Sequence, residues 1–283
     1  MKPFSLNIKG TLKEFDRPAI MGVVNATPDS FYDASRTMAA AEAAARAAKL
    51  HAAGASMIDV GGCSTRPGAK PVGEQEELDR LAEVLPAVRR AVPEAIVSVD
   101  TFRARVARIA VDELGADMVN DVSGGNIDPD MHDTVAELGV PYVLTHSRGD
   151  VSDMMEYTDY EMVTRDVLAE LGDRLQQLAL LGVADVIVDP GFGFSKTTEQ
   201  NYQLLADLEV FGLLHRPVLV GMSRKSMITN VLGIAADEAL CATTALNTMA
   251  LERGAAILRV HDPAQAQQAI LIYQKLQSCH RSE

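Results

Sequence analysis

AIMGVVN, at residues 19–25, is apolar up to its last position, where Asn25 ends the run. A short apolar run of this kind is typical of a strand that is buried on both faces, as in a parallel sheet. It continues into A-T-P-D (26–29) instead of the G-x-G-x-x-G turn that usually follows the first strand of an open, doubly wound sheet. The stretch therefore favours a closed barrel and leaves the open sheet as the structural alternative.

Seven further runs of the same character follow along the chain: SMIDVGG (56–62), IVSVDT (96–101), MVNDVS (118–123), PYVLTH (141–146), VIVDPG (186–191), PVLVGMS (217–223) and AILRVHD (256–262). Segments with helical spacing separate them, at about 38–53, 74–92, 103–114, 160–181 and 236–253. Eight strand and helix units in about 250 residues predict an α/β fold, a single (β/α)8 barrel. We expect one domain over 1–283, with a short N-terminal β-hairpin in 1–17 and the barrel in 18–283.

Composition and charge disfavour several classes of protein. The chain of 283 residues is 47% hydrophobic and 23% charged, which is ordinary for a globular fold, and its net charge of -13 disfavours binding to nucleic acid or to anionic lipid. Neither a signal peptide nor a run of about 20 apolar residues for a membrane span is recognisable. Three widely spaced cysteines fit neither a disulfide framework nor a zinc site, so we expect a reducing cytoplasm.

Polar residues end every predicted strand, and the carboxyl ends of the strands are where such barrels build their active sites. One Asn or Asp there could be a turn former, but a full set is harder to explain in that way. Asp100, Asn120 and Asp189 suit a planar heterocycle with N–H donors, and Lys225 could donate to the same molecule or simply pair with an aspartate. A second group suits an anionic phosphate: Asn25, Arg66, Arg259 and His261.

The G-G-C-S-T-R-P-G run (61–68) suits a phosphate group, but a turn rich in Gly and Ser is by itself weak evidence for a phosphate site. Cys63 lies inside it, yet no activating base stands at a recognisable spacing, which disfavours a thiol nucleophile.

Seven stretches together resemble the signature motifs of the dihydropteroate synthase family: MGVVNATPDSF (21–31), GGCSTRPGA (61–69), SVDT (98–101), NDVSG (120–124), DPGFGF (189–194), GMSRKSMI (221–228) and RVHD (259–262). The resemblance implies a TIM barrel. It also implies an Mg²⁺-dependent transferase of folate biosynthesis, which joins 6-hydroxymethyl-7,8-dihydropterin diphosphate to para-aminobenzoate with release of pyrophosphate. The same likeness implies a homodimer that is a sulfonamide target, and the charge and the cysteines add that it is cytoplasmic with no nucleic acid or membrane partner.

By the same resemblance, Asp100, Asn120, Asp189 and Lys225 hold the pterin, and Asn25 ligates Mg²⁺. Arg259 and His261 bind the diphosphate as well. The remaining assignments place Thr65, Arg66 and Ser226 at the aminobenzoate and bring Asp33 over the site. We expect the loops at 26–36 and 63–73 to close over bound diphosphate, so that substrates bind in order.

Several positions depart from the family pattern. Cys63 replaces a Glu, Tyr32-Asp33-Ala34-Ser35 replaces S-D-G-G, Thr145-His146-Ser147 replaces M-H-M, and Ser195 stands where Gly is common. Two alternatives of the same fold stay open: a pterin-binding methyltransferase, which resembles the family in its Asp and Asn pocket residues, and a catalytically silent pterin-binding protein, which the altered loops suggest. The methyltransferase would need neither S-R-K-S nor S-T-R-P, and a pure binder need not keep a diphosphate site.

Overall fold

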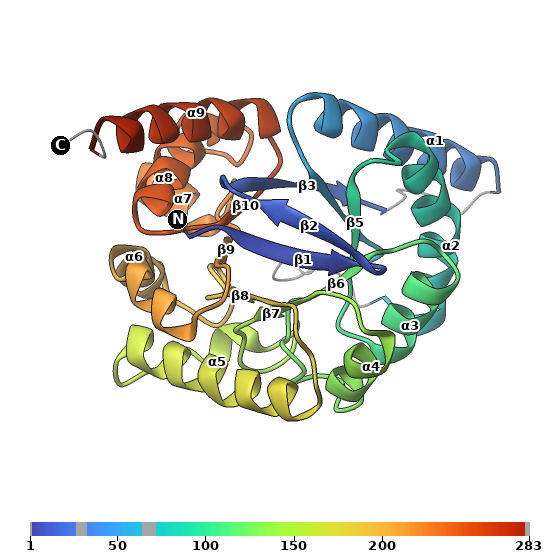
Figure 1. Ribbon diagram of the computed structural model, residues 1–283, viewed down its shortest axis with the longest axis horizontal. Helices are drawn as coiled ribbons and strands as arrows, with labels where there is room; N and C mark the ends of the chain where they lie inside the picture. Colours follow the sequence, from blue (N-terminus) through green and yellow to red (C-terminus); the bar gives the residue numbers. More distant parts are fainter. Residues whose placement is uncertain (1, 27–32, 64–71, 281–283) are drawn as a thin grey trace.

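Eight parallel strands form the centre of the molecule, in a computed structural model that describes residues 2–26, 33–63 and 72–280. The strands follow one another around the sheet in the order β8-β7-β6-β5-β4-β3-β10-β9. A bridge between Val188 and Val218 joins its two ends, so the sheet closes into the predicted barrel. Figure 1 looks along this barrel, with the helices arranged around the strands. The strands are β3 (Ala19–Asn25), β4 (Met57–Gly61), β5 (Ile96–Asp100), β6 (Met118–Asp121), β7 (Tyr142–Thr145), β8 (Val186–Asp189), β9 (Leu219–Val220) and β10 (Ile257–Val260).

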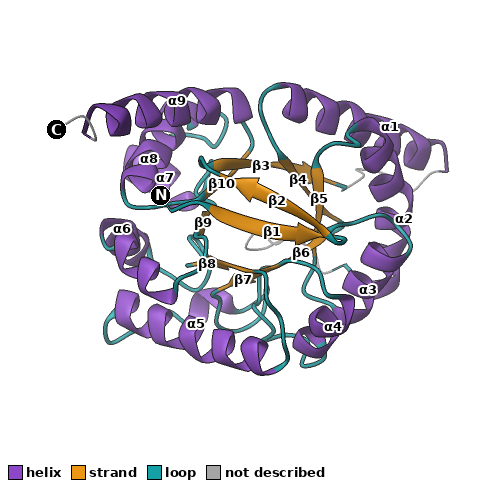
Figure 2. Ribbon diagram, in the orientation of Figure 1, coloured by secondary structure: helices purple, strands orange, loops and turns teal. Residues whose placement is uncertain are grey.

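Helices form the outer layer (Figure 2). They are α1 (Asp33–Ala52), α2 (Glu74–Ala91), α3 (Ala104–Asp112), α4 (Met131–Leu138), α5 (Val163–Leu180), α6 (Thr198–Ala206), α7 (Ser226–Leu232), α8 (Leu240–Glu252) and α9 (Pro263–His280), with 3₁₀ turns η1 (Met154–Glu156) and η2 (Leu208–Leu214). The five predicted helical segments correspond to α1, α2, α3, α5 and α8. Within the described ranges, no helix has both the length and the apolar character needed to cross a membrane.

The strands are shorter than the apolar runs predict at their carboxyl ends. β9 is the extreme case, since only Leu219 and Val220 of the run 217–223 are in strand conformation. The residues after Val220 leave strand conformation, and Arg224 adopts a left-handed conformation with φ 58°. The polar ends of the runs therefore belong to the loops that build the site.

Two apolar layers stabilise the barrel. One lies between strands and helices, and it includes Ile58, Val97 and Leu85. Gly22 of β3 allows a close approach there, because a Cβ at this position would lie 3.2 Å from the Leu50 side chain. The other fills the barrel interior near the amino ends of the strands, with Met57 as one of its members.

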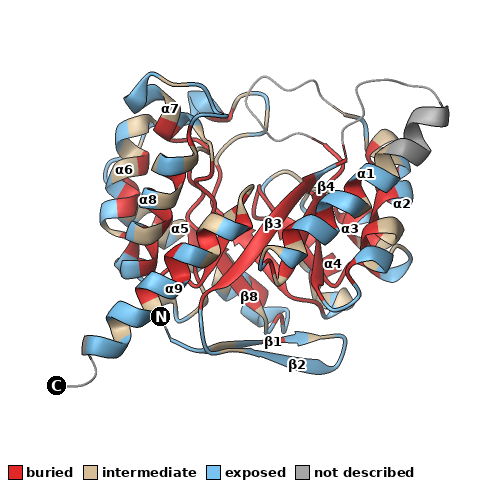
Figure 3. Cartoon of the chain, turned by 90° about the horizontal axis from the view of Figure 1, so that it is seen from above, coloured by how far each residue is buried: buried red, intermediate tan, exposed pale blue. Residues whose placement is uncertain are grey.

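The predicted hairpin is present as β1 (Phe4–Ile8) and β2 (Thr11–Phe15), joined by a tight turn at Lys9 and Gly10 with φ of 50° and 84°. Leu6 is 1% exposed and packs on the inner apolar layer, so the hairpin covers the amino ends of the strands. Figure 3 shows it opposite α7. Lys9 Nζ lies 3.1 Å from an Asp117 carboxylate oxygen, which ties the turn to the barrel.

Candidate active site

A polar layer lies inside the barrel above the apolar one. The register of the strands explains its position. Met21 pairs with Met57, and both side chains face the barrel interior. Because side chains alternate between the two faces of a strand, the next side chain that faces inward lies two residues further along each strand. The layer contains Asp59, Ser98, Asn120, Thr145, Asp189 and Arg259. Except for Arg259, each of these side chains is at least nine-tenths buried. Their convergence therefore creates a site that only a polar ligand would match.

Arg259 donates hydrogen bonds to two buried carboxylates, those of Asp59 in this layer and of Asp100 two residues after Ser98. Its Nε donates to Asp59 Oδ2 at 2.7 Å, and its Nη2 donates to Asp100 Oδ2 at 2.6 Å. Asn120 Nδ2 also donates to Asp59 Oδ2, at 2.9 Å. Since an ionised carboxylate only accepts, this contact fixes the Asn120 amide and directs its oxygen elsewhere. Burial raises the pKa of Asp100, and the Arg259 charge opposes that rise.

Asp59 was not among the residues predicted for the pterin. The sequence shows it as one more acidic strand end, and its role depends on Arg259, which lies 200 positions away. The inward register of the I-D-V-G-G run is the signal that could have identified it.

Asp189 and Lys225 occupy the opposite side of the layer. Asp189 Oδ1 accepts from Gly191 N at 2.8 Å, and burial raises the pKa of this carboxyl group. Lys225 Nζ donates to Phe192 O at 2.5 Å and lies 4.2 Å from the Phe194 ring centroid, a cation–π distance. Burial lowers the pKa of Lys225 to about 8, and nearby Asp189 opposes that shift. The structure therefore gives Lys225 backbone and aromatic partners in addition to a neighbouring aspartate.

A buried lysine braces the loop that carries these groups. Lys196, 2% exposed, donates to Phe194 O at 2.9 Å and to Gly191 O at 3.1 Å, and its Nζ lies 3.0 Å from His146 Nδ1. Burial lowers the pKa of Lys196 to about 7 and that of His146 to about 3. His146 is therefore neutral and turned toward Glu170, and Lys196 holds the loop against the end of β7.

The S-R-K-S and R-V-H-D motifs are joined by direct contacts. Arg224 donates through Nε and Nη2 to both carboxylate oxygens of Asp262, at 2.9 and 3.1 Å. Ser223 Oγ lies 3.0 Å from His261 Nδ1. These contacts hold the two motifs side by side.

A cavity of about 390 Å³ opens above the polar layer. Its lining brings together predicted site residues and Cys63: Asn25, Asp100, Lys225, Ser226, Arg259 and His261. Burial, followed by the charges of Glu77 and Asp100, raises the pKa of the Cys63 thiol to about 12. The thiol is therefore protonated at neutral pH, in line with the prediction that it is not a nucleophile.

Some predicted residues lie outside the described part of the chain. Thr65 and Arg66 are among them, as are most of the two loops expected to close. Asp33 is the first residue of α1, but its side chain is not described. Within residues 2–26, 33–63 and 72–280, no group of three His, Cys, Asp or Glu side chains is placed to hold a metal ion.

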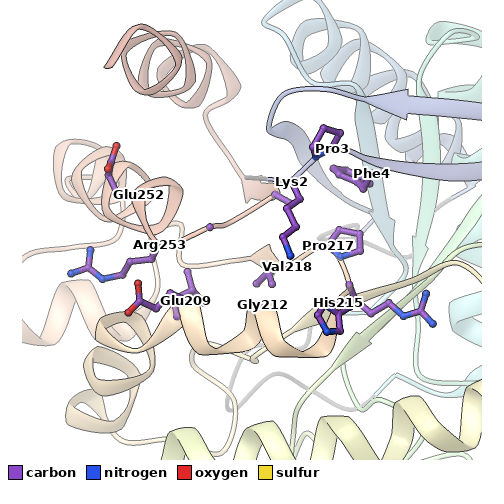
Figure 4. Close-up of a pocket in the computed structure, with 14 residues that line it drawn as sticks. Lys2, Pro3, Phe4, Glu209, Gly212, His215, Pro217, Val218, Glu252 and Arg253 are labelled. Atoms are coloured by element: carbon purple, nitrogen blue, oxygen red, sulfur yellow. The ribbon is translucent and has the colours of Figure 1, made fainter. Parts of the chain in front are cut away.

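A second hollow, of about 510 Å³, lies at the amino ends of the strands between the first residues, η2 and the end of α8 (Figure 4). Lys2 and Glu252 are exposed there, and Arg253 donates to Ala206 O and Met249 O, both at 3.3 Å. Its charged groups face water or backbone carbonyls, so the convergent chemistry belongs to the opposite end.

Comparison with known proteins agrees with this site. The family described as "Pterin binding enzyme" matches residues 21–261. Dihydropteroate synthase from Haemophilus influenzae is 39% identical over 259 residues, covering 91% of this chain and 93% of that protein. Xanthomonas albilineans dihydropteroate synthase, solved with 4-aminobenzoic acid, superposes with a TM-score of 0.87 at 38% identity, covering 96% and 98% of the two chains.

A longer relative, the mitochondrial folate synthesis bifunctional protein of Arabidopsis thaliana, is 41% identical over 259 residues. The match covers 86% of this chain but only 47% of that protein, so the chain spans about half the length of this relative. The family match runs from the third residue of β3 to just past the end of β10, including every polar strand end. The chain belongs to the dihydropteroate synthase family of pterin-binding enzymes.

Proposed function

We propose that this chain condenses 6-hydroxymethyl-7,8-dihydropterin diphosphate with para-aminobenzoate to give 7,8-dihydropteroate and pyrophosphate, a transferase step in folate biosynthesis. The observation that carries the proposal is the buried layer in which Arg259 joins Asp59 and Asp100, with Asn120 and Asp189 at inward positions of β6 and β8 and Lys225 in the lining of the cavity above. Burying so many polar groups costs free energy unless a ligand pairs with them, so this layer supports binding of a flat, hydrogen-bonding heterocycle.

The heterocycle and this layer match in donors and acceptors. Asp100 and Asp189 accept N–H donors of the pterin, and Lys225 donates to a ring nitrogen or carbonyl. As the diphosphate leaves, positive charge develops on the pterin methylene and spreads into the ring. The two carboxylates favour that charge because they are fixed in a buried, low-dielectric site.

Departure of the diphosphate requires positive charge at the mouth of the site. Arg259 and His261 line that mouth with Asn25. One amide oxygen is a weak protein site for Mg²⁺, but it fits an ion that is bound chiefly by substrate phosphates, as is usual for this metal. Asn25 would hold Mg²⁺ together with the diphosphate, and the ion would offset the charge of the leaving group.

The incoming amine needs no protein nucleophile. Para-aminobenzoate enters beside Ser226 at the start of α7, and we assign Thr65, Arg66 and Asp33 to the same pocket by family likeness. Its nitrogen attacks the methylene carbon, the carbon–oxygen bond to diphosphate breaks, and the proton lost from nitrogen passes to solvent. Sulfonamides, which carry a comparable aryl amine, would compete for this pocket.

The proposal extends to compartment and assembly. All three cysteines are free, with Cys241 and Cys279 exposed, which suits a reducing cytoplasm. Met249 of α8 and Leu271, Ile272 and Leu276 of α9 are large apolar side chains that are each about half exposed or more. These two helices pack together, and an exposed apolar surface of this kind supports a homodimer through α8 and α9.

A pyrophosphate-release assay tests the proposal. Purified protein with Mg²⁺ should release pyrophosphate only when both substrates are present, and Asp189→Ala should abolish most of the rate. Asp185→Ala is the control, since Asp185 contacts the hairpin at the far end of the barrel. Methyl transfer from a methylated folate to a corrinoid acceptor, without pyrophosphate release, would support the methyltransferase instead.

A further inference from the structure

Thr145 is a buried hydroxyl without a partner in the polar layer. Its side chain is 1% exposed, and Oγ1 makes no hydrogen bond with any residue that the structure describes. A buried hydroxyl left in this state costs about 1–3 kcal/mol, so native proteins rarely keep one without a use. Thr145 also stands where the family pattern has Met, which carries no hydroxyl.

The position of Thr145 directs this hydroxyl into the site. Thr145 is the last residue of β7 and pairs with Asp189 of β8. Val143, two residues earlier, belongs to the apolar layer inside the barrel and pairs with Asn120. Because alternate residues of a strand share a face, the Thr145 side chain points into the barrel between Asn120 and Asp189.

The hydroxyl cannot easily turn elsewhere. Threonine is branched at Cβ, which restricts its χ1 rotation. The next residue, His146, is held by its backbone N–H to Asp189 O at 2.9 Å and by its ring to Lys196. Ser147 Oγ lies 3.2 Å from Ser195 Oγ, which also accepts from Arg148 N at 2.7 Å. The end of β7 is therefore fixed, and Thr145 lies next to Asp189 in the polar layer inside the barrel.

We propose that the Thr145 hydroxyl hydrogen-bonds the heterocyclic substrate, as a specificity-determining contact that a Met at this position cannot make. The inference rests on the proposed function and adds to it a residue that can both donate and accept. Asp59, Asp100 and Asp189 only accept when ionised, so a neutral hydroxyl between Asn120 and Asp189 supplies a donor on that side of the ring.

Calorimetry with the pterin diphosphate alone tests this contact in Thr145→Val, which replaces the hydroxyl by a methyl group of nearly equal volume. We expect the Kd to rise by about fivefold to tenfold, as for loss of one hydrogen bond. Thermal stability should not fall, since the change removes an unpaired buried hydroxyl. Thr145→Ser should keep the Kd within about twofold of the parent chain.

Thr134→Val is a control outside the polar layer, because Thr134 is a buried threonine of α4 whose Oγ1 accepts from Arg108 Nη2 at 3.5 Å. It should leave the Kd unchanged. In steady state, Thr145→Val should raise the KM for the pterin diphosphate and leave that for para-aminobenzoate unaltered. An unchanged Kd in Thr145→Val, or a lower Tm with equal loss of both substrates, would overturn the inference. Absence of pterin binding by the parent chain would overturn the proposed function, and this contact with it.

Discussion

Asp59 accepts hydrogen bonds from Arg259 and Asn120 on one carboxylate oxygen, deep in the barrel. Its charge offsets that of the Arg259 guanidinium, which is largely buried. Its hydrogen bond with Asn120 sets the orientation of the Asn120 amide. A charge left without its partner in such a place is strongly destabilising. Residues that contact no substrate can therefore decide the shape and polarity of the site.

Replacing Asp59 tests this positioning role. Asp59→Asn should lower the free energy of unfolding by about 1–3 kcal/mol and weaken pterin binding at least about tenfold, because both donors lose a charged acceptor. Denaturant titration and calorimetry measure the two effects. Unchanged pterin affinity in a folded Asp59→Asn variant would show that Asn120 and Arg259 hold their orientation without it.

Lys225 should give the proposed reaction a pH dependence. Burial lowers its pKa to about 8, so the ammonium form that donates to Phe192 O and faces the Phe194 ring is lost as pH rises through about 8. The kcat/KM for the pterin diphosphate should therefore fall above that pH. Lys225→Arg stays charged over the whole range and should lack this alkaline limb; a limb that persists in this variant would assign it to another group.

Cys63 should be dispensable for chemistry. Its thiol has a pKa raised to about 12 by burial and by nearby carboxylates, so almost no thiolate exists at neutral pH. Cys63→Ser should keep most of the turnover number, measured under saturating substrates. A thousandfold loss of kcat with substrate binding intact would instead indicate covalent catalysis.

At the scale of elements, the loop from Asp189 to Lys196 is held at three places. Lys196 binds two of its carbonyl groups, Lys225 binds a third, and Ser195 bonds to the β7–α5 connection. Ser195 adopts φ 51°, a left-handed conformation that favours glycine. The hydrogen bonds of its hydroxyl group to Ser147 and Arg148 explain why a serine is kept there.

Ser195→Gly separates the strain from the hydrogen bonds. The change relieves about 1 kcal/mol of backbone strain but removes three contacts, Ser147 Oγ, Arg148 N and Arg148 O. We expect a net loss of about 1 kcal/mol in the free energy of unfolding, with pterin affinity within about twofold. Ser147→Ala, which removes only the 3.2 Å contact, should cost less. A gain in stability for Ser195→Gly would mean that strain outweighs the hydrogen bonds.

Prediction from sequence succeeded where a local pattern carries the information. Apolar runs with polar residues near their carboxyl ends located the strands and three residues of the polar layer, Asn120, Asp189 and Arg259, because the alternation of side chains along a strand can be read from a few consecutive residues. The sequence does not predict that Arg259 pairs with Asp59 or that Arg224 pairs with Asp262, because these contacts form only when the barrel closes. Lys196 was missed because nothing local marks a lysine that will be fully enclosed.

The molecule as a whole is acidic, yet it gathers Lys225, Arg259 and His261 at one cavity. Hydrogen-bond donors gathered locally in a protein of net charge -13 suit a small anion without attracting polyanions in general. The hairpin covers the opposite end of the barrel, and the cavity that suits the proposed substrates lies at the carboxyl ends of the strands. This arrangement supports a transferase that acts on a charged small molecule.

The most direct test of dihydropteroate synthesis at this site is the ratio of the two products formed from both substrates with Mg²⁺. Dihydropteroate is identified by mass spectrometry, and pyrophosphate is measured in the same sample. We predict equal amounts of the two products, and neither product when para-aminobenzoate is omitted. Pterin binding without turnover, or pyrophosphate released in the absence of the aromatic amine, would contradict the assignment of this site to dihydropteroate synthesis.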